Sequence, residues 1–376
     1  MATISAYETA NGRRYRVRYR KPDRTQTDKR GFKTKREAEL FASSVEVAKA
    51  RGEFIDATAA RATIGVLGAE WLATQTHLKP STARSIESAW RVHVEPVWGG
   101  RAVADVRHSE VQTWVTRLAR TKSATTAKRA HGILSSILQR AEKDRRVATN
   151  AARGVNLPRK KARKHIYLSH NQVDALASNA GEQATLVRFL AYTGLRWGEA
   201  TALRVRDLDL LRLRASVVEN AVRVGGRIVV GTPKSHRSRS VPIPQFLAES
   251  VSRLCEGKSR DALLFGDGGY YVRPPSSQSG WFERAVRATM AADVSFERVT
   301  PHDLRHTTAS LAISAGANVK AVQRMLGHAS AAMTLDIYAD LFDDDLDAVG
   351  AALNHAAGAA TVGRMWANGR ESTAVS

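Results

Sequence analysis

The chain has 376 residues, 43% of them hydrophobic, and this length and composition favour two or three folded domains over a disordered protein. Lysine and arginine outnumber aspartate and glutamate by 58 to 36, and the net charge of +22 predicts a polyanionic partner such as DNA, RNA or an acidic membrane surface. No run of residues is apolar enough for a transmembrane helix, the N-terminus lacks the order of a secretory signal, and Cys255 has no second cysteine to pair with, so we expect a cytoplasmic protein without a membrane partner.

Residues 1–60 are predicted to form a small α+β domain. Arginines alternate with apolar residues in its main strand, so that one face packs and the other is cationic. The packed face holds Tyr15, Val17 and Tyr19, and the cationic face holds Arg14, Arg16, Arg18 and Arg20. A turn near Pro22 and a second strand that ends near Phe32 complete a small sheet. Thr34 and Glu37 have the spacing of a capping box and predict a helix to about residue 50.

The same segment is rich in positive charge. Between Gly12 and Arg36 there are twelve lysines or arginines, and the acidic residues are Asp23 and Asp28. An ordinary solvated strand is one interpretation, since charged side chains usually face water. Four arginines at alternate positions without an interleaved carboxylate are unusual for solubility alone, and they favour contact with nucleic acid.

Residues 62–155 have helical periodicity and predict an all-α bundle. Apolar residues recur at helical spacing in three segments, and each segment contains a tryptophan. These are Trp71, Trp90 and Trp114. We expect them in the core rather than as platforms for base stacking, because Leu, Val or Ile accompany each of them. Ser81 and Ser109 are predicted N-caps, and residues 124–146 predict one long basic helix.

A basic linker is predicted at residues 156–165. Pro158 precedes five cations, which are Arg159, Lys160, Lys161, Arg163 and Lys164. Such a run is often only a soluble hinge. Between two DNA-binding domains it would follow the phosphates of a wrapped duplex.

Residues 166–356 mix helical and strand-like segments, and residues 357–376 form a tail with no predicted role. Helices are expected at 169–180, 183–192 and 281–290, and strands at 213–218 and 227–230. Six polar residues scattered over this half can together carry out phosphodiester chemistry. They are Arg196, Lys234, His302, Arg305, His328 and Tyr338.

Breaking a phosphodiester without a metal requires a nucleophile, cations at the non-bridging oxygens and a proton donor for the leaving oxygen. Arginine suits the oxygens because its planar fork stays charged at any working pH. Arg196 follows a turn at Gly194 and precedes a helix start, where its charge adds to the helix dipole. The alternative for Arg196 is an exposed side chain paired with Glu199.

Lysine can donate a proton where arginine cannot, so Lys234 is a candidate general acid. It lies between two strand-like segments and is expected at the tip of a hairpin. A simple surface-loop lysine is the alternative, and Arg237 and Arg239 compete as nearby cations.

His302 and Arg305 are three residues apart and share one face of a helix whose predicted N-cap is Thr300. His306 lies one turn beyond His302, and two histidines at this spacing raise the question of zinc. Asp303 stands where the zinc-protease motif has glutamate, and no third ligand is evident, so no metal is expected.

Gly327 is the expected end of an apolar-periodic helix, and His328 emerges directly after it. Tyr338 follows ten residues later and offers a nucleophile. A lone tyrosine among apolar neighbours is ordinarily half-buried core, because a phenol with a pKa near 10 attacks poorly unless it is activated. Two guanidinium groups and two histidines around it would favour the phenolate.

The local settings of these residues are TGLRWGEA, TPKSHRSR, HDLRH, LGH and TLDIYAD. Their order and approximate spacing resemble those of the tyrosine recombinase (phage integrase) family, and the resemblance covers nearly the whole chain. It selects Lys234 among its neighbouring cations and makes Tyr338 the nucleophile. It also implies that Arg305 holds the phosphate and that His302 takes part in proton transfer.

The same resemblance implies supporting roles and a fold class. Glu199 would support the active site and His306 would brace its helix. The fold would be multidomain: a three-stranded sheet with a helix, similar to the arm-binding domain of phage integrases, an all-α, SAM-like core-binding bundle, and a mixed, mainly-α catalytic domain of the tyrosine recombinase fold.

The activity implied is site-specific recombination through a 3′-phosphotyrosyl intermediate, which integrates and excises phage or mobile-element DNA. No cofactor is expected, because the phosphotyrosine conserves the energy of the broken bond. The implied partners are double-stranded DNA with core-type and arm-type attachment sites and three further copies of the chain in a homotetramer, at the nucleoid of the host cell. A host DNA-bending protein and an excision factor are candidates for additional partners.

Three alternatives stay open. A chromosome-dimer-resolving recombinase shares the chemistry, but such proteins typically lack an arm domain, which the basic N-terminal sheet resembles. A type IB topoisomerase would relax one duplex without recombining two sites. A DNA-binding regulator on an inactivated integrase scaffold would bind DNA without a covalent adduct.

Overall fold

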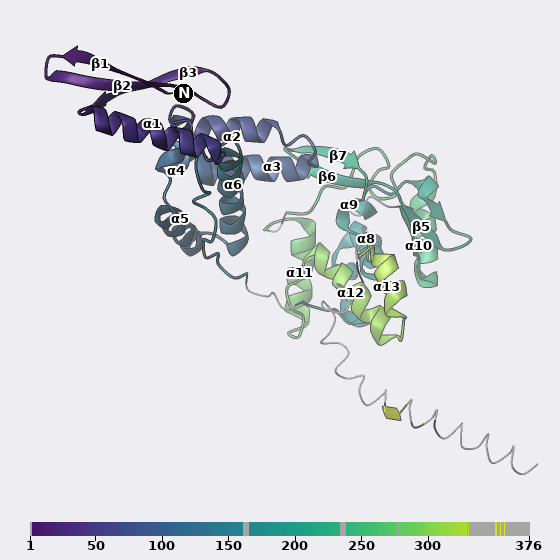
Figure 1. Ribbon diagram of the computed structural model, residues 1–376. Coiled ribbons are helices and arrows are strands. Elements are labelled where there is room, and N and C mark those ends of the chain that lie inside the picture. The colour runs from purple at the N-terminus through teal and green to yellow at the C-terminus, as the bar shows by residue number, and fades with distance from the viewer. Residues whose placement is uncertain are drawn as a thin grey trace, which may run out of the picture. The chain divides into compact units, whose positions relative to one another are not determined.

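The computed structural model describes residues 2–160, 165–233, 238–276, 278–328, 330, 350, 351, 354 and 357. It divides the chain into two compact units, Met1–Ala162 and Arg163–Ser376, each with its own hydrophobic core (Figure 1). Across the ranges just given, no helix combines the length and apolarity needed to cross a membrane. The finer domain boundaries proposed from the sequence remain predictions.

An antiparallel sheet opens the first unit, and one helix packs against it (Figure 1). The strands, in spatial order, are β1 (Thr3–Thr9), β2 (Gly12–Arg20) and β3 (Gln26–Phe32), and the helix is α1 (Lys35–Ala50). The alternation predicted for β2 is confirmed from Val17 to Arg20, where Val17 is buried and Arg18 and Arg20 are exposed, whereas Arg14 and Arg16 are half-buried. The Thr34 hydroxyl accepts a hydrogen bond from the amide of Glu37, which confirms the predicted N-cap of α1.

Helices form the rest of the first unit. They are α2 (Ile64–Ala73), α3 (Pro80–Ala89), a π-helical segment (Trp90–Val94), α4 (Glu95–Trp98), α5 (His108–Thr121) and α6 (Ala124–Lys143), with 3₁₀ turns at Ala59–Arg61 and Val103–Asp105. The long basic helix predicted from the sequence is α6, and it packs against α2, α3 and α5. Trp90 and Trp114 are buried and Trp71 packs at the edge of the core, so these tryptophans are structural.

Two predicted N-caps in this bundle are wrong. The helix α3 begins at Pro80 and not after Ser81, because proline lacks an amide hydrogen and its fixed φ suits the first helical position. The helix α5 begins before Ser109, because the Glu110 carboxylate accepts a hydrogen bond from the Arg107 amide at 3.1 Å. In both cases a neighbouring residue starts the helix earlier than the serine would.

The second unit is mainly helical (Figure 1). Its helices are α7 (His170–Asn179), α8 (Ala184–Thr193), α9 (Trp197–Ala200), α10 (Ala248–Cys255), α11 (Trp281–Ala292), α12 (Pro301–Ser314) and α13 (Val319–Leu326), with 3₁₀ turns at Gly181–Gln183, Val205–Asp207 and Gln245–Leu247. The core is centred on α8, whose Leu186, Phe189 and Leu190 are fully buried, and α7 and α12 pack against it. The helix α13 packs on α12, which brings the last described helix back to this core.

Two small antiparallel sheets accompany these helices. One contains β4 (Leu208–Asp209), β5 (Arg214–Val217) and β8 (Arg239–Pro242), and the other is a hairpin of β6 (Asn220–Val224) and β7 (Arg227–Gly231). Because β7 pairs with β6 and β8 pairs with β5, the segment between β7 and β8 joins two different sheets. The described strands on either side of Lys234 therefore do not pair with each other, and Lys234, which was expected at a hairpin tip, lies outside the described residues.

Candidate active site

The turn after α8 positions Arg196. Gly194 adopts the left-handed conformation (φ 64°) that ends α8, and a Cβ at this position would lie 2.5 Å from Leu326 of α13. Arg196 then caps α9, with Glu199 accepting hydrogen bonds from its amide at 3.0 Å and from its Nη1 at 2.8 Å. The ion pair considered from the sequence is therefore present, and 25% of the Arg196 side chain remains exposed.

Glu199 is a buried carboxylate held between two arginines. Its side chain has no exposed surface, and Arg239 donates to both oxygens, from Nη1 at 3.2 Å and from Nη2 at 2.6 Å. Burial on its own would raise the pKa of Glu199, but Arg239 and then Arg196 lower it below its ordinary value. Sequence reasoning considered Arg239 only as a rival to Lys234, because its partner is remote in the chain. A buried glutamate needs more than one hydrogen-bond donor to compensate its charge, and this requirement could have pointed to a second arginine beside Glu199.

The first two turns of α12 carry His302, Arg305 and His306. Asp303 accepts hydrogen bonds from the Thr300 amide at 2.8 Å and the Thr300 hydroxyl at 2.6 Å, and this arrangement confirms the predicted helix start. The Arg305 side chain is buried and donates to the Gly194 carbonyl at 2.6 Å and to the Leu326 carbonyl. These bonds fix the guanidinium between the turn that precedes Arg196 and the end of α13.

Two histidine rings of α12 and the ring of His165, which precedes α7 in the chain, lie next to one another. The ring centroids of His302 and His306 lie 5.1 Å apart, and those of His306 and His165 lie 4.4 Å apart. Burial, followed by the neighbouring His165, lowers the pKa of His306 to about 4. Partial burial, followed by the charge of Arg305, also lowers the pKa of His302. His165 was missed from the sequence, because no local pattern connects it with α12.

His328 leaves the end of α13. Gly327 ends the helix in the left-handed conformation (φ 66°), as predicted, and Gln323 Nε2 donates to the His328 carbonyl at 3.0 Å. Burial, followed by the charges of Arg305 and Arg196, lowers the pKa of His328 to about 4. The ring is therefore neutral near pH 7 in the free protein.

Four of the six predicted residues converge at this place in the second unit. They are Arg196, His302, Arg305 and His328. Arg305 joins the turn before Arg196 to the helix end before His328, and the positive charges of Arg305 and Arg196 affect both His302 and His328. His302 is exposed and Arg196 and His328 are half-buried, so the cluster is accessible from solvent while Arg305 lies beneath it. Such a concentration of guanidinium groups beside neutral imidazoles can bind a phosphodiester and transfer protons to or from the oxygens that react at it.

Several predicted residues lie outside the described part of the chain. They are Lys234, Tyr338, Lys161, Arg163 and Lys164. Arg159 and Lys160 of the same linker are described, and both are exposed. Among the residues that the structure describes, no group of three or more His, Cys, Asp or Glu side chains is arranged to hold a metal ion.

The cationic face of β2 has more polar and charged neighbours within the sheet than its sequence indicates. Arg16 donates from Nε to the Ser5 hydroxyl at 2.8 Å, and the backbone of Arg18 lies opposite that of Asp28 in the register of β2 and β3. Asp28 forms an ion pair with Arg30 at 2.9 Å, and the guanidinium of Arg30 lowers the pKa of that carboxyl. A carboxylate therefore lies among these cations on the neighbouring strand, although none is interleaved along β2 itself. Arg14, like Arg16, is half-buried.

Two family models match this chain. The phage integrase family model matches residues 166–344, and the phage integrase central domain model matches residues 65–156. The putative prophage phiRv2 integrase of Mycobacterium tuberculosis is 30% identical over 286 residues, which cover 73% of this chain and 73% of that protein. The chain belongs to the phage integrase family. This tyrosine recombinase also matches the integrase of Mycobacterium phage L5, with 29% identity over 64% of this chain and 66% of that protein.

Solved structures agree with the fold of this tyrosine recombinase. A structure of the Tn1549 transposon integrase in complex with a circular intermediate DNA superposes with a TM-score of 0.66 at 22% identity, and covers 76% of this chain and 99% of the other. A lambda integrase tetramer bound to a Holliday junction superposes with a TM-score of 0.54 at 16% identity, and covers 86% and 95%. At these identities the likeness concerns the fold.

Proposed function

We propose that this tyrosine recombinase cleaves and rejoins DNA at attachment sites through Tyr338, and so integrates and excises phage or mobile-element DNA. The observation that carries the proposal is the convergence of Arg196, His302, Arg305 and His328 beside the Gly194 turn and the end of α13. Two guanidinium groups neutralise the non-bridging oxygens of a scissile phosphate, and this charge neutralisation favours the transition state more than the ground state.

The reaction follows from the groups available. The Tyr338 oxygen attacks the phosphorus and gives up its proton, for which neutral His302 is the acceptor. The bond from phosphorus to the 5′ oxygen breaks, and Lys234 protonates that oxygen, which leaves a 5′-hydroxyl and a 3′-phosphotyrosine. A 5′-hydroxyl from the partner duplex then attacks the phosphotyrosine, and the two protons return by the same routes.

The two undescribed residues are tethered to this cluster by the chain. Lys234 directly follows Pro233, the last described residue before the gap, and lies five residues before Arg239. Five residues span at most about 18 Å, which allows Lys234 to reach the residues that surround Glu199. Tyr338 is ten residues beyond His328, and its reach of at most about 35 Å allows it to act in its own active site or in that of a neighbouring copy.

The fold is consistent with three domains that have separate roles on DNA. The basic sheet with α1 binds arm-type sites, the helical bundle is the SAM-like core-binding domain, and residues 166–356 form the catalytic domain. The active assembly is a homotetramer on two duplexes, in line with the lambda integrase, whose structure is that of a tetramer bound to a Holliday junction. A host DNA-bending protein and an excision factor complete the proposed partners.

The test uses duplexes with a randomised core and a nick near the cleavage point, so that the short released strand cannot be religated. The wild-type protein becomes covalently joined to DNA, whereas Tyr338→Phe binds the same duplexes without an adduct. Tyr270→Phe is the matched control, because Tyr270 is 81% exposed and remote in sequence from the candidate residues. It retains wild-type adduct formation.

Two results would contradict the proposal. An adduct that persists in Tyr338→Phe excludes Tyr338 as the nucleophile. Sequence-selective binding by the wild type without any adduct excludes the recombinase reaction and supports a DNA-binding regulator instead.

A further inference from the structure

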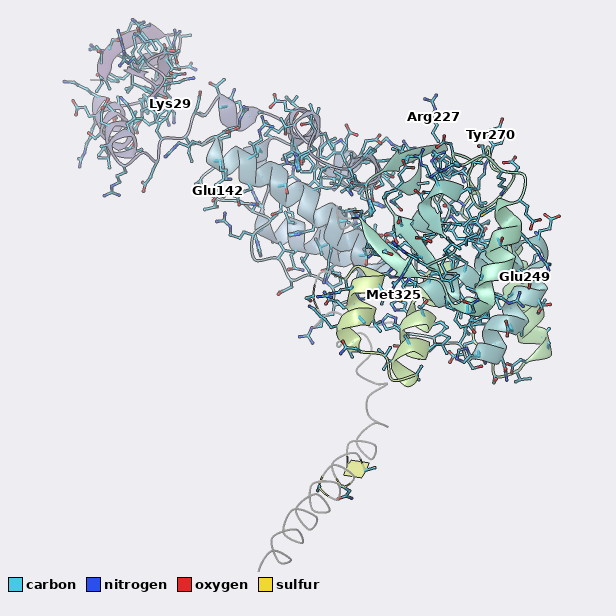
Figure 2. The ribbon with its side chains drawn as sticks, turned by 90° about the vertical axis from the view of Figure 1, so that its right-hand side faces the viewer. Lys29, Glu142, Arg227, Glu249, Tyr270 and Met325 are labelled. Carbon is cyan, nitrogen blue, oxygen red and sulfur yellow. The ribbon has the colours of Figure 1, made fainter. Side chains whose placement is uncertain are left out.

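The end of α13 is held by side chains from three different elements. Arg239 of β8 donates from Nε to the Met325 carbonyl at 2.8 Å, Arg305 of α12 donates to the Leu326 carbonyl, and Gln323 donates to the His328 carbonyl at 3.0 Å. Met325 is labelled in the last turn of α13 in Figure 2. A helix C-terminus leaves its last carbonyls without partners within the helix and carries partial negative charge, so two guanidinium groups are well suited to this position.

Arg239 connects this helix end to the carboxylate that holds Arg196. Its Nη1 and Nη2 bind the two oxygens of Glu199 in the paired geometry that makes arginine–carboxylate contacts directional. Glu199 in turn accepts from the amide and the guanidinium of Arg196. A continuous path of hydrogen bonds therefore runs from Arg196 through Glu199 and Arg239 to Met325, three residues before His328.

Arg239 is directed inward and not toward solvent. Its side chain is 9% exposed, against 25% for Arg196, and it donates to Glu199 and the Met325 carbonyl. A Cβ added at Gly327 would lie 3.3 Å from its side chain, so Arg239 also packs against the turn that leads to His328. These contacts hold Arg239 to Glu199 and to the end of α13, and they point to a group that shapes the site.

We propose that Arg239 is a positioning residue that fixes His328 relative to Arg196 by bridging Glu199 and the end of α13. Arg239 also begins β8, five residues after Lys234, so the same contacts fix the start of the strand that follows the proposed general acid in the chain. The inference rests on the proposed function for its effect on cleavage, but the bridge itself can be tested without DNA.

The first experiment follows the histidine rings of the DNA-free full chain by NMR during an acid titration. In Arg239→Met, the pKa of His328 rises from about 4, because the variant loses a nearby positive charge and the packing that keeps the ring partly buried. Arg287→Met is the matched control: it also removes an arginine–glutamate pair, and Glu283 retains Arg298 as its partner. The control leaves the titration of His328 unchanged.

The second experiment separates DNA affinity from the cleavage rate on the nicked duplexes. Arg239→Met keeps the Kd of the control but cleaves roughly 100-fold more slowly at saturating DNA, because misplaced groups slow an oriented reaction by about this factor. Arg239→Lys restores the charge but has a single ammonium in place of the planar fork, and it recovers only part of the rate. The double variant of Arg239→Met with Glu199→Gln cleaves only slightly more slowly than the slower of the two single variants, because both substitutions break the same path of hydrogen bonds.

The outcomes are distinct. Wild-type titration of His328 and wild-type cleavage in Arg239→Met overturn the inference. If Arg239→Met does not fold, Arg239→Lys decides the question, because full activity with a single ammonium overturns the bridge. A loss confined to DNA affinity assigns Arg239 to phosphate binding and overturns positioning. If the wild type forms no adduct, the proposed function fails, and the titration of His328 alone then decides whether the bridge exists.

Discussion

The arginines of the N-terminal sheet and the arginines around Glu199 have the same side chain in opposite surroundings. On β2, Arg18 and Arg20 are exposed. In the second unit, Arg305 and Arg239 are almost fully enclosed, and their guanidinium groups donate to carbonyls at the end of α13. An exposed arginine can leave its partners for a phosphate at little cost, whereas an enclosed one keeps a fixed position set by its partners. The difference predicts which substitutions change binding and which change the site.

The largest expected effect is at Glu199. Glu199→Gln removes the negative charge that Arg196 and Arg239 share, and breaking a buried ion pair from one side destabilises a protein by about 3 kcal/mol. Urea unfolding of the full chain measures this loss. Glu249→Gln is the control, because Glu249 and its partner Arg253 are both largely exposed, and it changes stability by less than about 0.5 kcal/mol. Equal losses of stability in the Glu199 and Glu249 variants would contradict the larger effect expected for the buried ion pairs.

The next effect is at Arg305. Arg305→Met leaves the buried carbonyls of Gly194 and Leu326 without this donor, which costs about 2 kcal/mol in unfolding free energy. The same substitution in the first unit, Arg18→Met on β2, is expected to lower the unfolding free energy by less than about 0.5 kcal/mol. Urea unfolding of both variants measures the difference. A larger loss in the Arg18 variant would reverse the comparison.

Acid provides a test of the enclosed histidines. The pKa values of His306 and His328 lie near 4 in the folded protein, below the ordinary value of 6.5. Between these two pH values the unfolded chain binds more protons than the folded one, so the unfolding free energy falls as the pH is lowered from 6.5 toward 4. Chemical unfolding at a series of pH values measures the slope. His306→Phe keeps a ring beside His165 and removes one titrating group, so it flattens the slope; an unchanged slope would contradict the assignment.

The smallest effect on stability, and the clearest on binding, concerns β2. Changing both Arg18 and Arg20 to glutamine lowers the slope of log affinity against log salt for arm-type DNA by about 2, because each phosphate contact contributes about 0.9. Titrations at several salt concentrations measure the slope. Arg253→Gln, an exposed cation of α10, is the control and leaves arm-site binding unchanged. An unchanged slope in the double variant would remove β2 from the interface.

Features that depend on near neighbours were predictable from the sequence. The period of two in β2, the Thr34 and Thr300 caps and the Gly327 helix end each depend on residues within a few positions of one another. The same locality explains the error at Ser81, where Pro80 competes for the helix start.

Features that depend on distant residues were not predictable. The contact between Arg239 and Glu199 spans 40 residues, and the contact between the rings of His165 and His306 joins the start of the second unit to α12. Strand pairing in the second unit is of the same kind, since nothing in the sequence near Lys234 shows that β8 pairs with β5 rather than with β7. The candidate residues could thus be named from motifs, but the path that positions them required the fold.

The central claim is that the cluster in the second unit activates Tyr338 for attack on a phosphodiester. The most direct measurement is to trap the wild-type protein on a nicked duplex, digest protein and DNA, and identify the joined peptide by mass spectrometry. We predict a nucleotide linked through its 3′-phosphate to the peptide that contains Tyr338. A linkage to another residue, or to a 5′-phosphate, would contradict the account.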